Sequence, residues 1–505
     1  MKRRDFLKQA GCAAMGSTTL LSSLTNLKAL NGVLGKSTVS SPNPTDYKAL
    51  VCVLLAGGLD SYNLLIPSGT GANGDNGHAD YSSVRTDLAI PQDQLLPLVN
   101  PNAQPLCSGF NGMSCEYGSF GVHPSVTGIR DMFNAGHLAF MSNIGTLVEP
   151  ITNATEYETK KRPLGLYSHA DQIMQWQTSV PQSRDALGVG GRFADLLHAA
   201  NSYEQISMNI SLSGKNVFQR GKDYAEYSIS DNINANNVGF ESLPSWWSNS
   251  GLLTQLRNAA VDSLVSESYS NLLQNTYSST AKQSINSFDI FKQALQRVHS
   301  FNTPFPDTGL GNDMKAIAKT ISVRNELGAK RQIFFVTIGG WDMHDDLLVG
   351  LNGRLPQVSG ALKAFYDATV ELGISDKVTT FTISDFARTI TSNGEGSDHA
   401  WGGNSMVMGG AVKGGKIYGS YPRMNVSNYD RNVSNRGHFI PALSTDELYA
   451  ELALWYGVSP YDLCYVLPNL GNFYSYSPNN YPVGFMDFAG TTVSSDNKPQ
   501  GCTTY

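Results

Sequence analysis

The chain has 505 residues, of which 41% are hydrophobic and 15% are charged. This composition excludes a chain that is disordered over most of its length, and the length allows one large domain or two. The formal net charge of -6 argues against a nucleic-acid-binding protein, because such proteins normally present a basic face.

The first 29 residues have the pattern of an export signal. Lys2 begins the run KRRDFLK, and a mildly apolar stretch and small residues follow, as is typical of the twin-arginine route. We expect cleavage after Ala29, a linker over residues 30–47, and a periplasmic or secreted protein. No later stretch has the roughly 18 uninterrupted apolar residues of a membrane helix, so no stable membrane span is expected.

Five cysteines remain after the signal, which suits an oxidising compartment. Cys107 and Cys115 are close in sequence and are expected to pair. Cys464 is expected to bond to Cys502 and so hold the polar tail. Cys52 lies in an apolar run and is interpreted as a packed thiol. No CxxC motif is present, which argues against a thiolate zinc site.

The N-terminal half alternates predicted strands with predicted helices. Residues 49–56 form a nearly continuous apolar run, as in a parallel strand that is covered on both faces. Helical spacing follows over 125–133, with Pro124 suited to the first turn. A short strand is expected at 138–141. Two helices are expected after it, one from Tyr167-Ser168-His169 through Trp176 and one over 188–200.

The C-terminal half resumes this alternation after a different segment. Residues 200–330 are rich in Ser and Asn and are interpreted as a helical insertion or cap, with helical spacing over 252–298. Further elements are then predicted in the order strand, helix, strand, strand, helix, at 333–338, 351–372, 378–383, 405–408 and 445–456. The βαβ order predicts an α/β fold with a central, mostly parallel sheet and helices on both faces. We expect a single domain over residues 48–505.

Acidic and imidazole side chains follow three of the predicted buried strands. The run VCVLLAGGLD ends in Asp60, and IFFVTIGGWDMH contains Asp342 and His344. The run TTFTISD ends in Asp385, and the next loop carries Asp398-His399. In doubly wound sheets, ligands lie beyond the carboxyl ends of the strands. This mixed nitrogen and oxygen set predicts a divalent metal site that suits zinc or manganese.

A structural interpretation competes with the metal site. A single Asp after a strand is commonly a turn residue or a helix cap, and a single His is commonly structural. The paired glycines, 57–58 and 339–340, also serve as turn formers, although they allow a ligand to approach the backbone closely. The combination of several strand-end acids with two histidines favours the metal site.

The motifs, taken together, resemble a known family. The chain is similar to a widespread exported bacterial family, domain of unknown function 1501, through the ordered motifs GGLDSYN, HPS, YSHADQ, GVGGRFAD, GGWDMH, SDFART, SDHAWGGNSMVMGG and STDELYAELALWYGV. The resemblance covers nearly all of the mature chain and is weakest over residues 200–330.

That family in turn resembles the alkaline phosphatase and sulfatase superfamily, which implies an alkaline-phosphatase-like fold. Asp60 matches that superfamily's first-strand metal ligand, and Asp342 with His344 resembles the ligands of its other metal. Asp385 matches the acid of a later Asp-His pair, and His399 matches a late histidine ligand. The chain departs from the pattern where Phe386 replaces the histidine of the Asp-His pair, which leaves one well-held ion as an alternative to two.

The resemblance leaves the nucleophile open. Ser125 lies at a helix start where a nucleophile would be expected, His123 is an alternative ligand or nucleophile, and Ser61 is a third candidate. Arg388 is expected either to bind substrate oxygens or to form a structural ion pair. His169 either donates to the leaving group or caps its helix. Asp398 either binds metal or orients His399.

Two functions remain open at this point, and a third, a sugar-binding surface module, draws only on the many Tyr and Asn residues. The first is an exported metal-dependent hydrolase of phosphate or sulfate esters, acting on a small-molecule ester. The second is a non-catalytic periplasmic or cell-surface binding or assembly protein that retains a degenerate site. The resemblance also leaves open a co-exported protein partner.

Overall fold

The computed structural model describes residues 46–71, 75–107, 109–203, 206–229, 290–424 and 426–489, together with isolated residues between 255 and 287. The predicted signal at 1–29 and nearly all of the predicted linker at 30–47 therefore lie outside the described residues. In the described part, no helix combines the length and the apolar character that crossing a membrane requires.

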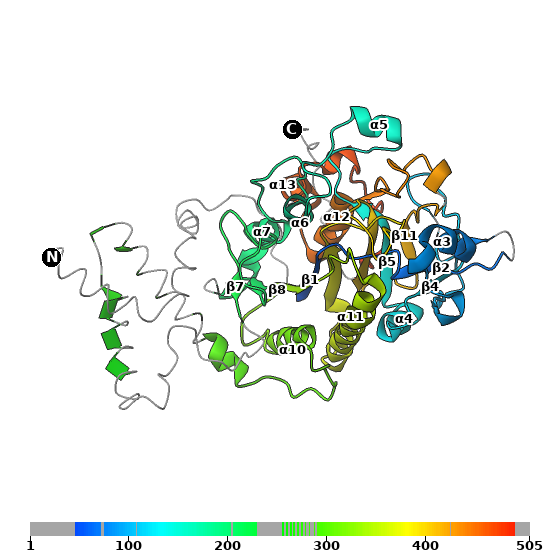
Figure 1. Cartoon of the computed structure of the whole chain (residues 1–505). Coiled ribbons are helices and arrows are strands. Elements are labelled where there is room, and N and C mark those ends of the chain that lie inside the picture. Colours follow the sequence, from blue (N-terminus) through cyan, green and yellow to red (C-terminus); the bar gives the residue numbers. More distant parts are fainter. Residues whose placement is uncertain are drawn as a thin grey trace.

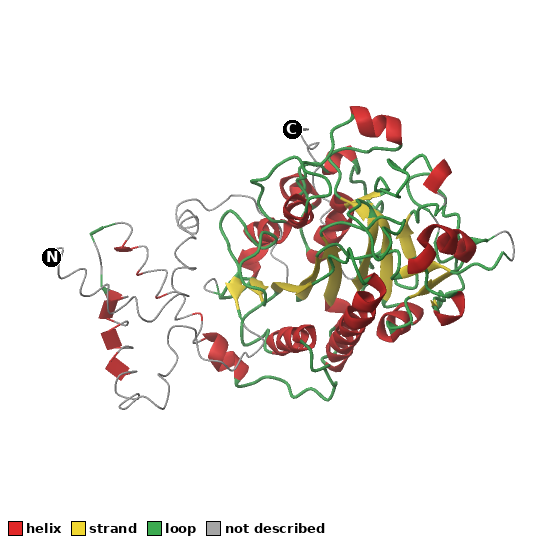
Figure 2. Ribbon diagram, viewed as in Figure 1, coloured by secondary structure: helices red, strands yellow, loops and turns green. Residues whose placement is uncertain are grey.

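A central sheet organises the described chain (Figures 1 and 2). Its strand order is β11-β5-β10-β9-β1-β8-β6-β7, with β12 paired to β5. All pairs are parallel except those of β10 with β5 and β9. The strands are β1 (Lys48–Ala56), β5 (Leu138–Gly145), β6 (Asn209–Ser211), β7 (Tyr227–Ser228), β8 (Arg331–Gly339), β9 (Val378–Ser384), β10 (Gly403–Met408), β11 (Ile417–Gly419) and β12 (Leu443–Ser444).

Helices cover both faces of this sheet. The α-helices with described bounds are α3 (Gly77–Arg85), α4 (Thr127–Asn134), α5 (Ala154–Thr159), α6 (His169–Thr178), α7 (Val189–Leu197), α10 (Gly309–Ser322), α11 (Leu347–Glu371), α12 (Thr445–Tyr456) and α13 (Leu463–Val466). A small antiparallel sheet joins β2 (Leu65–Pro67), β4 (Phe120–Val122) and β3 (Leu96–Pro97). The predicted α/β class with a mostly parallel sheet is confirmed.

The alternation of side chains along β1 explains why two helical layers form. Ala49, Val51, Val53 and Leu55 belong to the hydrophobic core that also contains α4, α10 and α11. The intervening Leu50, Cys52 and Leu54 belong to the core that contains α7, α12 and α13. Successive strand residues point to opposite faces, so a strand that is apolar at every position needs cover on both.

The segment predicted as an insertion contributes to these layers where it is described. Within 200–330, β6 pairs with β8 in the central sheet, and α10 packs against α11 and β8. The stretch predicted as helical, 252–298, is described only in part.

The described cysteines include one complete disulfide, between Cys107 and Cys115, as predicted. Cys52 is a buried free thiol, also as predicted. Cys464 is disulfide-bonded, and its predicted partner Cys502 lies outside the described residues.

Helix α12 carries a buried carboxyl group in its first turn. Ser444 caps the helix, and the hydroxyl groups of Ser179 and Ser444 donate hydrogen bonds to Asp446 Oδ2 at 3.0 and 3.2 Å. The side chain of Asp446 is fully buried, and this burial raises its pKa to about 7. The folded protein therefore retains a proton on Asp446 at pH values where the unfolded chain has released it.

We expect Asp446→Asn to change the pH dependence of stability. Because the folded pKa is the higher one, wild-type stability conferred by this group is complete below about pH 4 and is lost as the pH rises toward 7. The variant keeps the shape of the side chain and cannot ionise. We therefore measure the free energy of unfolding of both proteins in urea from pH 4 to 8. The value for the variant minus the value for the wild type should rise by about 2–4 kcal/mol between these two pH values. Parallel pH profiles for the two proteins would contradict this account.

Candidate metal centre

The carboxyl ends of adjacent strands place the candidate ligands at one edge of the sheet. In the order β9-β1-β8, Asp385 follows β9, the pair Gly57-Gly58 follows β1, and Asp342 follows β8. His399 comes from the loop between β9 and β10. His169 is the first residue of α6, whose N-cap Ser168 accepts a hydrogen bond from Asp171 N–H. The segments are thus far apart in sequence and adjacent in space.

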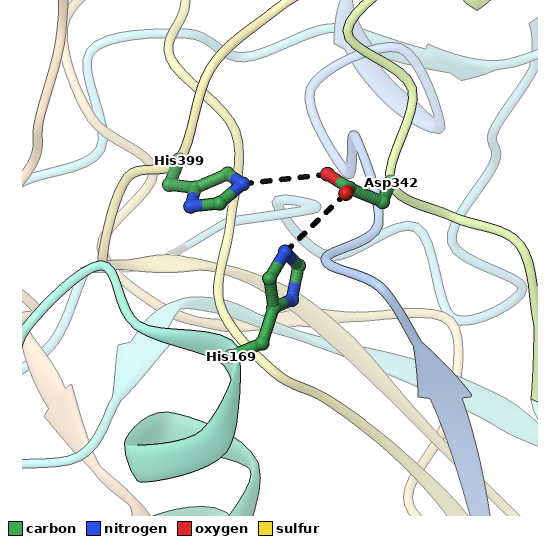
Figure 3. Close-up of side chains that lie close together, drawn as sticks. All are labelled: His169, Asp342 and His399. Atoms are coloured by element: carbon green, nitrogen blue, oxygen red, sulfur yellow. Dashed lines mark hydrogen bonds and ion pairs between the residues drawn. The ribbon is translucent and has the colours of Figure 1, made fainter.

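Three side chains form a compact group that could hold a metal ion. His169, Asp342 and His399 each offer a ligand atom, and these atoms all lie within 4.8 Å of one another (Figure 3). His399 Nε2 is 3.3 Å from Asp342 Oδ1, and His169 Nε2 is 3.5 Å from Asp342 Oδ2. His344 Nε2 adds a fourth donor, 3.0 Å from both Asp342 Oδ1 and His399 Nε2.

Each histidine of this centre is anchored through its other ring nitrogen. His169 Nδ1 lies 2.7 Å from Asp385 Oδ2, and His344 Nδ1 lies 3.0 Å from Asp398 Oδ1. His399 Nδ1 lies 2.8 Å from the carbonyl oxygen of Tyr167. All three partners are acceptors, so each Nδ1 must carry the proton. This is the arrangement of metal-binding histidines, in which the second nitrogen donates to a carboxylate or carbonyl.

This anchoring leaves two imidazole lone pairs facing each other. When His344 and His399 are neutral, both Nε2 atoms are acceptors, and they are only 3.0 Å apart. Two acceptors at that distance repel each other unless a proton or a cation lies between them. His169 Nε2 is also buried without a hydrogen-bond partner. The donor set is therefore incomplete without a positive charge at its centre.

Arg388 lies buried next to Asp342 and fixes the position of its carboxylate. Its side chain is fully buried and forms an ion pair with Asp342 Oδ1. It also donates to the carbonyl oxygens of Gly58 at 2.9 Å, Gly57 at 2.8 Å and Ser397 at 2.7 Å. Arg388 is therefore turned away from solvent and forms an ion pair, the second of the two roles expected for it.

Electrostatics keep the ligands in the states that a metal requires. Burial would raise the pKa of Asp342, but the hydrogen bond and charge of Arg388 outweigh it and hold this pKa below the usual range. Burial lowers the pKa of His399, and the charges of Arg388 and His169 lower it further. Asp342 is thus ionised and His399 neutral at neutral pH, as metal ligands must be.

Phe386 closes one side of the centre. Its ring centroid lies 4.7 Å from that of His169 and 4.4 Å from that of His399. Gly58 has φ +81°, and a Cβ there would come within 2.5 Å of the Phe386 ring. Gly58 was expected to allow a ligand to approach the backbone, and in the structure it instead makes room for the ring of Phe386.

Asp60, predicted as a ligand, does not join the centre. It is buried in an ion pair with Arg85, which also donates to the carbonyl oxygens of Thr389 and Ile390 at 3.1 Å each. A buried carboxylate needs such a partner, and Arg85 on α3 supplies it. Asp385 and Asp398, also predicted as ligands, do not face the centre. They accept hydrogen bonds from the Nδ1 atoms of His169 and His344 and so hold these two rings in place.

The nucleophile candidates also lie elsewhere in the described structure. His123 Nδ1 is 2.7 Å from Ser125 Oγ, and the backbone N–H of His123 donates to Leu64. Burial lowers the pKa of His123 to about 4. Ser61 Oγ accepts a hydrogen bond from the backbone N–H of Asn404 at 2.8 Å. Among the described residues, no contact links these three side chains to the histidines of the centre, which are His169, His344 and His399.

The structure gives His169 a different position from the one expected for a leaving-group donor. The motif YSHADQ indicated that His169 begins a helix, and side chains at a helix start point toward its N-terminal end. His169 was not included among the predicted metal ligands, although this signal could have suggested it. The Tyr167 carbonyl acceptor left no comparable signal, because it depends on a left-handed φ of 72° at Tyr167.

Comparison with known proteins supports the family resemblance over part of the chain. A family model described as Protein of unknown function (DUF1501) matches residues 262–440, which include Asp342, His344 and His399. Over these residues, the match confirms the resemblance that the motifs indicated. The search of curated proteins found no match.

Two solved structures share distant similarity with the chain. The crystal structure of Ps i-CgsB in complex with k-i-k-neocarrahexaose is 10% identical, with 82% of this chain and 73% of that chain covered and a TM-score of 0.29. The PsFucS1 sulfatase from Pseudoalteromonas sp. is 11% identical, with 82% and 78% covered and a TM-score of 0.24. Similarity at this level says nothing about the activity of this chain.

We expect Arg388→Met to destabilise the fold even without metal. The variant leaves Asp342 unpaired and three carbonyl groups without their donor, which should cost about 3–5 kcal/mol of unfolding free energy. Arg423→Met is the matched control, because Arg423 is 43% exposed and pairs with Glu116 at the surface. Denaturant unfolding should show a large shift in midpoint for the first variant only. Equal shifts would contradict a supporting role for Arg388.

Proposed function

We propose that the protein is an exported, metal-dependent hydrolase that holds one divalent ion between His169, Asp342, His344 and His399. The observation that carries the proposal is the shared orientation of the three histidines. Each Nδ1 is fixed by an acceptor, and each Nε2 is directed toward Asp342. With all three histidines neutral, hydrogen bonding within the protein does not satisfy this set.

The donor distances and types fit a transition metal. A site with these four donors and one open position for water is five-coordinate, and bonds of about 2.1 Å then place neighbouring donor atoms about 3.0 Å apart at 90° and about 3.6 Å apart at 120°. Four of the six separations within the set run from 3.0 to 3.5 Å, with His344 and His399 near Asp342 Oδ1 and His169 near Asp342 Oδ2. Three imidazoles and one carboxylate favour zinc, with manganese as the alternative, over calcium, which takes oxygen ligands. Phe386 occupies the place of a further ligand in the resembled superfamily, which favours one ion over two.

The chemistry of the proposed reaction follows from the residues around the centre. A divalent ion held by these four residues with one position left open would supply Lewis acidity and would lower the pKa of a water molecule bound at that position. Arg388 keeps the Asp342 carboxylate oriented and ionised, and Asp398 and Asp385 hold the imidazole rings. Phe386 excludes water from one side. Because Ser61, His123 and Ser125 are bonded elsewhere, we assign attack to water rather than to a side chain.

The substrate class rests on the motif resemblance to alkaline phosphatases and sulfatases, which favours phosphate or sulfate esters. Export by the twin-arginine route, to the periplasm or the medium, rests on the N-terminal motif and remains a prediction. A co-exported protein partner is likewise a prediction that no described contact tests.

One observation favours a non-catalytic binding protein as the second candidate. The side chains expected to act as nucleophile form hydrogen bonds away from the histidines. A site that retains its ligands without a protein nucleophile could serve to bind a ligand or to stabilise the fold. Both candidate functions include a bound metal ion, and only the first includes hydrolysis of a substrate.

Metal content provides the first test of the centre. The mature protein should bind zinc at one ion per chain by isothermal titration and elemental analysis. Asp398→Asn loses an outer partner and should weaken the affinity about 10- to 100-fold, and His399→Ala, which loses a ligand, should weaken it more. His299→Ala is the control, because His299 is 42% exposed and bonds to Glu371. Binding that is unchanged in His399→Ala would exclude this centre.

Turnover provides the second test. Zinc- or manganese-loaded protein should hydrolyse at least one member of a panel of phosphate and sulfate esters, and chelation or Asp342→Ala should abolish the activity. The Ser125→Ala and Ser61→Ala variants should remain active, because attack is assigned to water. Loss of activity in a correctly folded Ser125→Ala protein would contradict that assignment. Tight metal binding with no hydrolysis of any ester would select the binding-protein candidate.

A further inference from the structure

The segment that leads into α6 contributes to two of the candidate ligands. His169, at the start of the helix, is itself a candidate ligand. Two residues earlier, the carbonyl oxygen of Tyr167 lies 2.8 Å from His399 Nδ1 and is the acceptor that holds this ring. Residues 165–169 therefore place one imidazole directly and a second one through a backbone carbonyl. The second role depends on the conformation of Tyr167.

Tyr167 has an unusual backbone conformation. Its φ of 72° lies in the left-handed region, which residues with a large side chain rarely occupy. Such a conformation persists only where the surrounding structure holds it. The Tyr167 ring contacts the ring of His438 edge-on, with centroids 4.9 Å apart, but ring packing does not set the direction of the carbonyl group. That direction is set by the two peptide groups that flank the residue.

Hydrogen bonds fix both of these peptide groups. The Ser168 N–H donates to the Gly165 carbonyl at 3.0 Å. This N–H and the Tyr167 carbonyl belong to one trans peptide group and point in opposite directions, so the bond also fixes the carbonyl that faces His399. The Tyr167 N–H belongs to the other peptide group and donates to Gln172 Oε1 at 2.6 Å. A side chain of α6 thus holds the turn that precedes the helix.

The surroundings of Gln172 indicate that it is needed as an acceptor. The residue is 0% exposed, and its Nε2 is buried without a hydrogen-bond partner among the described residues. A buried amide that leaves its donor group unsatisfied destabilises the fold relative to an apolar side chain of the same shape. The contact that offsets this penalty is the one from Tyr167 N–H. Gln172 lies four residues after Ser168, and helical side chains lean toward the preceding turn, so its amide reaches this N–H.

We infer that Gln172 is a positioning residue for the candidate metal centre. By accepting from Tyr167 N–H, it holds the left-handed turn whose carbonyl keeps the His399 proton on Nδ1 and leaves His399 Nε2 free to bind an ion. The inference rests on the proposed metal centre and adds to it a residue that acts only through Tyr167 and His399. Partners that orient metal-binding imidazoles commonly alter the affinity for the ion.

Substitution of Gln172 in the intact mature protein tests the inference without relying on turnover. Gln172→Met removes the acceptor and nearly keeps the length of the side chain. Its affinity for zinc, measured by titration, should fall about 10-fold, because the orientation of His399 is no longer fixed. In zinc-loaded wild type, proton NMR should show a slowly exchanging His399 Nδ1–H signal, assigned by its proximity to Tyr167. This proton should exchange faster with water in the variant.

A rescue variant and a matched control separate this role from general stability. Gln172→Glu should remain close to the wild type, because a buried carboxyl group keeps its proton and its other oxygen still accepts from Tyr167 N–H. Gln177→Met is the control. Gln177 is a buried glutamine of the same helix, and its Oε1 accepts from the N–H groups of Val217 at 3.1 Å and Phe218 at 2.9 Å. The control should lower the midpoint of denaturant unfolding and leave zinc affinity unchanged.

The outcomes distinguish this inference from the proposed centre. If Gln172→Met keeps the zinc affinity and the Nδ1–H signal of the wild type, the inference fails and the metal centre stands. Equal losses of affinity in Gln177→Met or in Gln172→Glu also overturn it, because neither variant removes the acceptor for Tyr167. If Gln172→Met does not fold, Gln172→Asn replaces it, since the shorter amide does not reach this N–H. Wild-type protein that takes up no zinc overturns both proposals.

Discussion

The ion pair between Arg388 and Asp342 is the interaction on which the candidate centre depends. Among the described contacts, His169, His344 and His399 all approach Asp342, and Arg388 sets the position of its carboxylate. Through the carbonyl groups of Gly57, Gly58 and Ser397, the same guanidinium joins two further segments to the one that carries Asp342. The buried charge is thus compensated by the chain segments that build the site, and folding and ligand placement are coupled.

The sheet determines why these segments meet. β1 is buried on both faces, and its neighbours β8 and β9 run parallel to it, so all three end at the same edge. Backbone groups at that edge have no further strand partner and must find other acceptors and donors. Asp385 accepts from Gly57 N–H at 3.0 Å, and Arg388 takes the neighbouring carbonyl groups. Charged side chains are therefore required there for structural reasons before any ligand is considered.

Apolar periodicity was enough to predict the fold class and most of the elements. The run at 49–56 and the helix at 445–456 carry their pattern in adjacent residues, and the structure has them as β1 and α12. Asp342, His344 and His399 were predicted because strand ends of a parallel sheet share an edge. Asp60 satisfied the same rule and yet faces Arg85, a residue from a helix that no local pattern connects to it. Pairing between buried charges distant in sequence is not encoded in spacing, so this distinction required the structure.

The contrast between Asp60 and Asp342 also bears on what kind of site this chain can offer. Each is an acid near the end of a buried strand, and each is paired with a buried arginine. Asp60 is 2% exposed and no imidazole approaches it among the described contacts, whereas the side chain of Asp342 is 47% exposed and approached by three. Phe386 occupies the space between the histidines and Gly58. Because an aromatic ring and an arginine stand where further ligands could be, the candidate ligand set suits a single ion rather than two.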